Sequence, residues 1–206
     1  MGIEDLTELQ VLEGSFSLIW VIIATISGLK IVYKSVKLDR RDHITVGLSL
    51  ILVTSPWWSS SIQFVLYIVW DITLSAFTYL LIMNFMIPIA LLTWIYSFSN
   101  ITYPDYKKIL MGIYVPICIL MEVLLIYFLL TNIEMIGTVE GLFDSRHSLF
   151  GLVFQLFAII SVMVTGVIFS IRTMKVDIKA IQWRGRFMLI AFLSFSLTIT
   201  LYSRQY

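Results

Sequence analysis

The chain has 206 residues, of which 59% are hydrophobic and only 13% are charged, and its formal net charge is +1. Soluble domains carry about 25% charged residues, so a globule with this composition and a mean hydropathy of +0.94 could not hide its side chains from water. The composition predicts an all-α, polytopic membrane protein whose main partner is the lipid bilayer, and the near-neutral charge indicates no nucleic-acid partner. A β-barrel is not expected, because its strands would alternate whereas these runs are continuously apolar.

Six apolar runs are long enough to cross a bilayer as helices, which takes about 20 residues each. The first 13 residues contain acidic side chains but no Lys or Arg, so the first run is expected to be a permanent anchor and not a signal peptide. The chain is therefore predicted to form one bundle domain over residues 1–206. Its predicted spans are 14–36, 44–70, 72–98, 107–131, 147–171 and 184–204.

The second predicted span has the segment TSPWWSSSIQF, residues 54–64, at its centre. A turn there would leave two pieces too short to cross about 30 Å of hydrocarbon, with unpaired backbone groups in lipid. A single helix kinked at Pro56 avoids both costs, and a re-entrant hairpin buried in protein is the alternative. Because Ser55, Ser59 and Gln63 recur every four residues, this helix is expected to turn a polar face toward the bundle core.

The third predicted span contains Pro88, which is expected to kink it as Pro56 kinks the second. Asn84 lies one turn before this proline and near the middle of the span. Its amide is expected to satisfy the backbone carbonyl that the proline releases, with a role in ligand contact as the alternative.

Glu122 is the only acidic residue deep in a predicted span. A charge at mid-helix costs about 2.5–3.5 kcal/mol on insertion scales, so this residue is expected to face the bundle interior. It could be a ligand contact, an ion site or a proton-coupled switch, or it could be a neutral carboxyl that only fastens a neighbouring helix. Gln63 and Gln155 are predicted at a similar depth, roughly 10–14 Å below the outer surface. The three groups could line a shallow outward pocket, or each could meet a different partner.

Basic residues concentrate in the loops after the first, third and fifth spans, which hold twelve of the fourteen Lys and Arg when Lys30 is included. The positive-inside rule then places these loops in the cytoplasm and the N-terminus outside, in a multi-pass protein of the cell membrane. In the last of these loops, Arg172, Lys175, Lys179 and Arg186 fall at helical spacing. They predict either an amphipathic extension on the inner leaflet or an ordinary positive-inside loop. The longest outer loop, residues 132–148, is acidic and could serve as a lid.

The sequence contains no metal-ligand set, no nucleotide-binding loop and no hydrolase motif. No cofactor, metal or enzymatic activity is therefore expected.

Four stretches resemble archaeal seven-helix membrane proteins of unknown function and, more loosely, the seven-helix N-terminal sensor modules of histidine kinases. The stretches are SPWWSSSIQF, YLLIMNFMIPIALLTWIYSF, IGTVEGLFD and RGRFMLIAFLSF. Members of that group continue into a seventh helix, whereas this sequence stops at LTITLYSRQY. The resemblance thus implies a natural six-helix variant or a truncated sequence, and a cytoplasmic output domain would require the missing helix.

The first hypothesis for function is a non-enzymatic sensor or receptor-like module. It would bind a small or lipid-like ligand from the outer side through Glu122, Gln155, Gln63 and Asn84, and act on a cytoplasmic or membrane signalling partner. A transporter or channel subunit and a non-catalytic membrane scaffold are the alternatives. The sequence predicts neither the ligand nor the oligomeric state.

Overall fold

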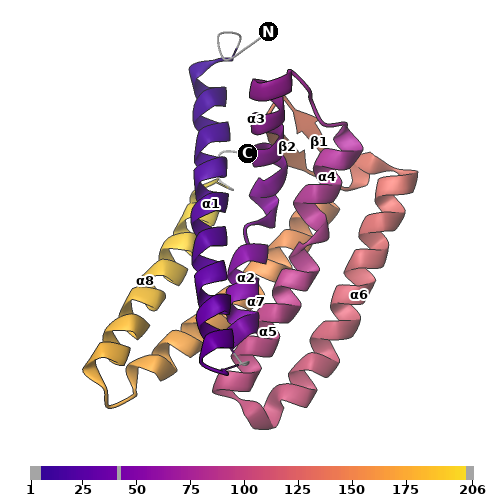
Figure 1. Cartoon of the computed structure of the whole chain (residues 1–206). Helices are drawn as coiled ribbons and strands as arrows, with labels where there is room; N and C mark the ends of the chain where they lie inside the picture. The colour runs from indigo at the N-terminus through magenta and orange to yellow at the C-terminus, as the bar shows by residue number, and fades with distance from the viewer. Residues whose placement is uncertain (1–5, 41–42, 203–206) are drawn as a thin grey trace.

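The computed structural model describes residues 6–40 and 43–202, with side chains described up to residue 194 (Figure 1). Over these residues the chain is all-α apart from one small hairpin. The helices are α1 (Glu8–Lys37), α2 (Ile44–Leu52), α3 (Trp58–Trp70), α4 (Ala76–Phe85), α5 (Ile87–Thr102), α6 (Lys107–Thr131), α7 (Leu149–Met174) and α8 (Lys179–Tyr202). Three 3-10 turns, η3 (Ser55–Trp57), η4 (Pro104–Tyr106) and η5 (Ile133–Met135), and two strands, β1 (Gly137–Glu140) and β2 (Asp144–His147), complete the described elements.

Four described stretches are long and apolar enough to cross a membrane: Glu8–Lys37, Ala76–Thr102, Pro104–Thr131 and Leu149–Met174. They correspond to the first, third, fourth and fifth predicted spans, so the all-α class is confirmed. The second predicted span is divided between two shorter helices. The sixth corresponds to α8, which carries three basic residues in its first eight positions, and its predicted end at 203–204 lies outside the described residues.

The second span runs back along α1 as an interrupted helix. Gly14 lies against the ring of Phe64, and Gly28 lies against Gly47, so α2 and α3 follow α1 in the antiparallel direction. The two contacts are separated by 14 residues along α1 (14 to 28) and by 17 residues along the α2–α3 segment (47 to 64). The three additional residues of the α2–α3 segment are accommodated by the η3 interruption. The geometry supports one traverse of the bundle and not a re-entrant hairpin (Figure 1).

Both predicted proline kinks are confirmed as helix interruptions. Pro56 lies at the start of η3, and Pro88 lies in the first turn of α5, directly after the break at Met86. A proline cannot donate a backbone hydrogen bond, so each one ends the ladder of the helix before it and starts a new one. At Pro56 the interruption spans the η3 turn, whereas at Pro88 it is limited to the single residue Met86 between α4 and α5.

The continuous stretch α4–α5 is the centre of the bundle. α4 packs against α3 and α6, and α5 packs against α2, α6 and α7. Two buried clusters surround it. One joins α4, α6 and the start of the hairpin through Tyr79, Leu80, Met83, Leu125, Leu129 and Ile136. The other joins α5, α6 and α7 through Ile87, Leu91, Ile95, Cys118, Phe154 and Ala158.

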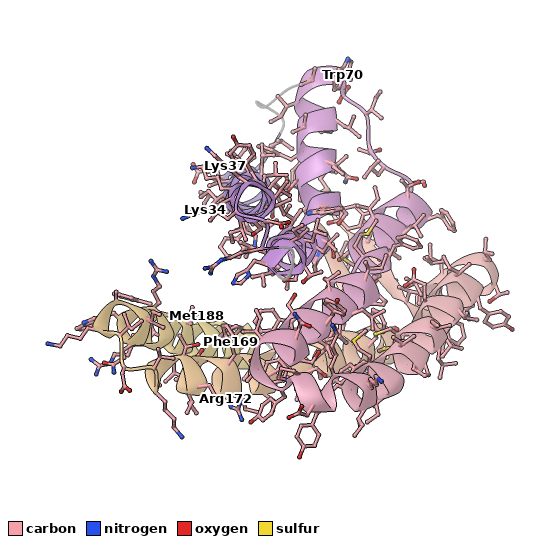
Figure 2. The ribbon with its side chains drawn as sticks, turned by 60° about the horizontal axis from the view of Figure 1, so that its bottom comes forward. Lys34, Lys37, Trp70, Phe169, Arg172 and Met188 are labelled. Carbon is pink, nitrogen blue, oxygen red and sulfur yellow. The ribbon has the colours of Figure 1, made fainter. Side chains whose placement is uncertain are left out.

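Charge separates the two ends of the bundle. We define the basic end as the one with the α1–α2, α5–α6 and α7–α8 connections, where Lys34, Lys37 and Arg172 lie (Figure 2). Ten of the fourteen Lys and Arg fall there within the described residues: 34, 37, 40, 107, 108, 172, 175, 179, 184 and 186. The opposite, acidic end holds Glu8, Glu13, Asp71, Glu134, Glu140 and Asp144. The predicted grouping of the basic loops on one side is thus borne out in space.

The basic residues that predicted either an amphipathic extension or an ordinary loop are divided between two helices joined by a short turn. α7 continues to Met174 and α8 begins at Lys179, so Arg172 lies on one helix and Lys179 and Arg186 lie on the other. The Arg172 guanidinium lies 3.8 Å from the centre of the Tyr103 ring and donates to the carbonyl oxygen of Thr102. It therefore fastens the end of α7 to the end of α5, a role different from that of a free basic face.

The close approach of α1 and α2 gives a stability prediction. A Cβ at Gly47 would lie 2.7 Å from the Gly28 carbonyl oxygen, a backbone atom that cannot move away cheaply. We expect Gly47→Ala to destabilise the protein by roughly 1–3 kcal/mol. Gly112→Ala in α6 is the matched control, because nothing lies within 4 Å of its added Cβ, and it should be neutral or stabilising by up to about 1 kcal/mol. Thermal unfolding of purified protein measures both, and equal effects would contradict the close packing.

Candidate functional site

The most organised polar site lies at the acidic end, where the hairpin tip enters the space between α3 and α4. Ser60 Oγ donates to the main-chain oxygen of Phe143 at 2.8 Å, and the Tyr79 hydroxyl donates to the same oxygen at 2.9 Å. Ser60 and Tyr79 are also 2.7 Å apart. The Gln63 amide donates to the main-chain oxygen of Leu142. Because a buried turn must have its carbonyls satisfied, these side chains allow the tip to be buried.

Aromatic packing covers this network. The Phe143 side chain is only 4% exposed. Its ring lies 5.4 Å from that of Phe64 and 6.4 Å from that of Tyr67, both on α3 and both in edge-on geometry. The hairpin tip therefore closes the acidic end of the α3–α4 interface, and a role of this loop as a lid stays a prediction.

The base of the hairpin is fixed to α7. Ser148 caps this helix by accepting from the Gly151 backbone N–H at 3.2 Å, and its hydroxyl also donates to the Met135 carbonyl. The Ser148 N–H donates to the Ile136 carbonyl at 3.1 Å. Gly141 turns the chain between the two strands at φ +77°, a conformation that favours glycine. The hairpin is thus held at both its tip and its base.

Gln63 and Asn84, two of the four predicted ligand residues, have local partners. Besides its bond to the hairpin, Gln63 accepts from the Leu74 backbone N–H at 3.1 Å. Asn84 donates to the carbonyl of Leu80 at 2.9 Å. Pro88 has no backbone N–H, so the carbonyl that it leaves without a donor is the one four residues earlier, that of Asn84 itself. The Asn84 side chain instead bonds the Leu80 carbonyl, so the expected bond from this side chain to a carbonyl released by the proline is wrong.

The other two predicted residues, Glu122 and Gln155, lie on α6 and α7. Both carboxyl oxygens of Glu122 are buried and have no hydrogen-bond partner among the described residues. Glu122 lies between Cys118 and Leu125, which belong to the two different buried clusters. Gln155 is half-buried beside Phe154. α4 lies between α3 and α6, so Gln63 and Glu122 do not meet directly, and their shared pocket stays a prediction (Figure 1).

Unpartnered oxygens mark the helix interruptions. α3 and α4 are antiparallel, and Ser60 on α3 faces Tyr79 on α4. Ser55 lies five residues before Ser60 and Asn84 lies five residues after Tyr79, so Ser55 and Asn84 fall at the same level of the bundle. The Oγ atoms of Ser55 and Ser59 and the Oδ1 of Asn84 are buried without a partner among the described residues. The predicted polar stripe of Ser55, Ser59 and Gln63 is therefore buried as expected. Around Ser55 and Ser59, a buried water molecule would find polar partners.

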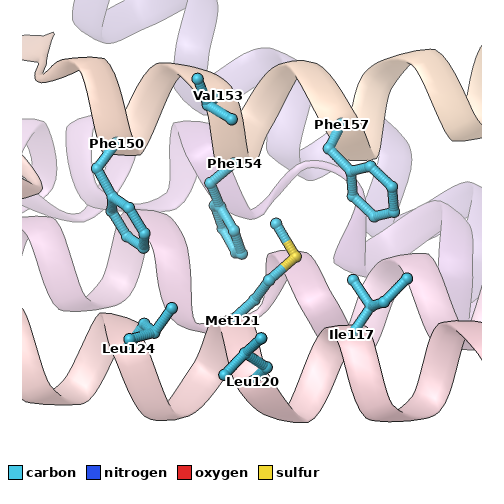
Figure 3. Close-up of a pocket in the computed structure, with 8 residues that line it drawn as sticks. All are labelled: Ile117, Leu120, Met121, Leu124, Phe150, Val153, Phe154 and Phe157. Carbon is cyan, nitrogen blue, oxygen red and sulfur yellow. The ribbon is translucent and has the colours of Figure 1, made fainter.

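A second candidate site, which the sequence did not predict, is an apolar groove between α6 and α7 (Figure 3). These helices follow each other in the chain, but both pack on α5 rather than on each other, and α7 packs also on α8. The α6 side of the groove is formed by Ile117, Leu120, Met121 and Leu124. The α7 side is formed by Phe150, Val153, Phe154 and Phe157. The cavity measures about 240 Å³, and continuous apolar runs give no sequence signal that would single out its residues.

Comparison with known proteins finds no match: no family model, curated protein or solved structure is significantly similar to the chain. Within the described residues, no group of three or more His, Cys, Asp or Glu side chains is placed to hold a metal ion.

The buried His147 at the hairpin base gives a pH prediction. Burial lowers the pKa of His147 below its ordinary value, although the charge of Asp144 acts in the opposite direction. The unfolded chain then binds the proton near pH 6.5 and the folded chain only at a lower pH. The contribution of neutral His147 to the free energy of unfolding is therefore complete above about pH 6.5, and it is lost as the pH falls toward the lowered pKa of the folded state.

Thermal unfolding between pH 7.5 and 5 measures this effect. We expect the His147→Gln variant to lose part of the acid sensitivity, because it removes the group that must be protonated. His43→Gln is the matched control, since His43 is exposed at the basic end, and it should keep the wild-type pH profile. An unchanged pH profile in His147→Gln would show that other groups cause the acid sensitivity.

Proposed function

We propose that the chain is a multi-pass protein of the cell membrane that crosses the bilayer six times, with its N-terminus and the β1–β2 hairpin outside. The separation of charge between the two ends supports this placement, because basic residues are retained on the cytoplasmic side. The interrupted α2–α3 segment, running the length of α1, and α8 supply the two traverses beyond the four long apolar stretches.

Within this placement we propose a non-enzymatic, sensor or receptor-like module that binds a small or lipid-like ligand from outside. The observation that carries the proposal is the hairpin tip on Ser60, Gln63 and Tyr79. These buried donors hold carbonyl oxygens of a surface hairpin, and a ligand with acceptor groups could take the place of the tip. Because the hairpin connects α6 and α7 in the chain, displacement of its tip would shift the ends of these two helices.

Glu122 is the second element of the proposed ligand response. Its buried carboxyl lies on α6, between Cys118 and Leu125 in the chain, and lacks a partner among the described residues, a costly arrangement that binding sites retain. If Glu122→Gln keeps every ligand-induced change, the acid plays no part in ligand recognition.

A transporter is the second candidate, supported by one observation. Small hydroxyl side chains continue inward from Ser55, through Ser49 on α2, to a 2.7 Å bond between Ser97 of α5 and Thr45 of α2. The α2–α5 interface is therefore polar along much of its length, although small polar residues also serve simply to pack helices. Solute flux into proteoliposomes tests this alternative.

Cysteine labelling tests the placement in the membrane. In a Cys118→Ala background, we expect Lys108→Cys and Asp177→Cys to be shielded from an impermeant maleimide in intact cells and to react after lysis. Glu140→Cys in the hairpin should react in intact cells. All three positions are exposed, so burial in the protein does not explain a lack of labelling. Labelling of position 108 or 177 from outside would overturn the orientation.

Hydrogen exchange of the hairpin amides tests the sensor function. Tyr79→Phe removes a hydroxyl bonded to Ser60 and Phe143, so we expect faster exchange at the tip, by about fivefold, in lipid nanodiscs. Tyr114→Phe is the matched control, because this ring packs on Phe157 away from the hairpin. Oleate and lysophosphatidylcholine are the first probes. A ligand should alter tip exchange in the wild type, and a panel that never does so would count against the sensor proposal.

A further inference from the structure

The α6/α7 groove is a feature of the bundle that the proposed sensor function does not use. Its two walls carry only apolar side chains, and they come from helices long and apolar enough to cross a membrane. Leu120, which lines it, is 58% exposed, so the groove opens sideways toward the surroundings of the bundle. An empty groove would lose dispersion contacts along both walls, and an apolar cavity does not hold water stably.

We propose that this groove holds one acyl chain of a bilayer phospholipid whose headgroup carries both a phosphate and an ammonium group and lies at Arg146. The inference rests on the proposed membrane placement. It assigns a lateral lipid site that is separate from the hairpin network and does not require sensing.

The dimensions of the groove favour a single chain. It extends from Leu124 to Ile117 on α6, seven residues or about 10 Å along the helix. An aromatic pair lies near each end: Phe128 and Phe150 at 5.0 Å toward the acidic end, and Tyr114 and Phe157 at 6.0 Å toward the basic end. The groove stays open along its side, where Leu120 is exposed, so a chain can enter and leave there. The 240 Å³ volume is smaller than the roughly 300–1,000 Å³ of pockets for drug-sized ligands. A further helix would need an axis spacing of about 8–10 Å from both walls, which a groove of this size does not provide.

The charges at the outer end favour a zwitterionic headgroup. Arg146 is exposed and is the lone Lys or Arg at the acidic end within the described part of the chain. It lies four residues before Phe150, the nearest groove residue, and an arginine fork suits a phosphate. Asp144 lies two residues before Arg146 on the same side of β2, and Glu140 is its partner across the hairpin. These two carboxylates would repel a purely anionic headgroup and attract an ammonium group beside the phosphate.

Native mass spectrometry of the detergent-solubilised full chain tests the proposal. The probes are phosphatidylethanolamine and phosphatidylglycerol with identical palmitoyl and oleoyl chains. We expect about one tightly retained phosphatidylethanolamine per chain. Its preference over phosphatidylglycerol should be roughly threefold, because interactions between exposed charges, here Arg146, Asp144 and the headgroup, are weak.

Ile117→Trp fills the groove and should weaken retention about tenfold or more. Ile119→Trp, on the same helix but 57% exposed outside the groove, is the matched control and should leave retention unchanged. Leu124→Trp fills the other end of the groove and replaces Ile117→Trp if that variant unfolds. Arg146→Ala should reduce the headgroup preference to parity while the chain still binds.

Equal retention in the groove-filling variants and in Ile119→Trp would overturn the acyl-chain site. A preference that Arg146→Ala leaves unchanged, or its absence in the wild type, would overturn the headgroup assignment. Retention is measured without any hairpin response, so these failures are distinct from a failure of the sensor function. A wrong orientation would appear in the labelling of positions 108, 140 and 177 and not in this experiment.

Discussion

The acidic end of this protein depends on satisfying the main-chain carbonyls of a buried turn. The tip of the β1–β2 hairpin is inserted between α3 and α4, where little water can reach it. The carbonyls of Leu142 and Phe143 would each carry a large desolvation cost if they had no donors. Ser60, Gln63 and Tyr79 provide those donors, and Phe64 and Tyr67 cover them. Of the polar stripe in the interrupted second span, only Gln63 is thus explained by this hairpin, whose Leu142 lies 79 residues further along the chain.

Two kinds of information decided what could be predicted. α6 was predicted with the observed bounds, because a continuous apolar run between polar turns fixes a helix locally. The interruptions at Pro56 and Pro88 were predicted for the same reason, since a missing N–H acts within one turn. The role of Gln63 was not predicted, because depth along a helix does not reveal a contact with a distant hairpin. The α6/α7 groove was invisible for a related reason: it exists only because α5 keeps two neighbouring helices apart.

The two candidate sites share the same framework. α6 and α7 form the walls of the groove, and the hairpin that connects them is the element docked on α3 and α4. Ile136, at the start of the hairpin, belongs to the buried cluster of α4 and α6, and Phe150 packs beside it at the start of α7. In the proposed receptor, a change in the spacing of α6 and α7 would therefore be coupled to the docking of the tip through these contacts.

The long sequence separation within the hairpin network has a consequence for biogenesis. Ser60 and its acceptor Phe143 are 83 residues apart, and Gln63 and Leu142 are 79 apart. When α3 and α4 first leave the ribosome, the segment that will occupy their donors has not been translated. If the proposed six-span placement holds, the nascent second and third spans keep these polar groups solvated, at the membrane surface or in the insertion machinery, until the hairpin has been synthesised.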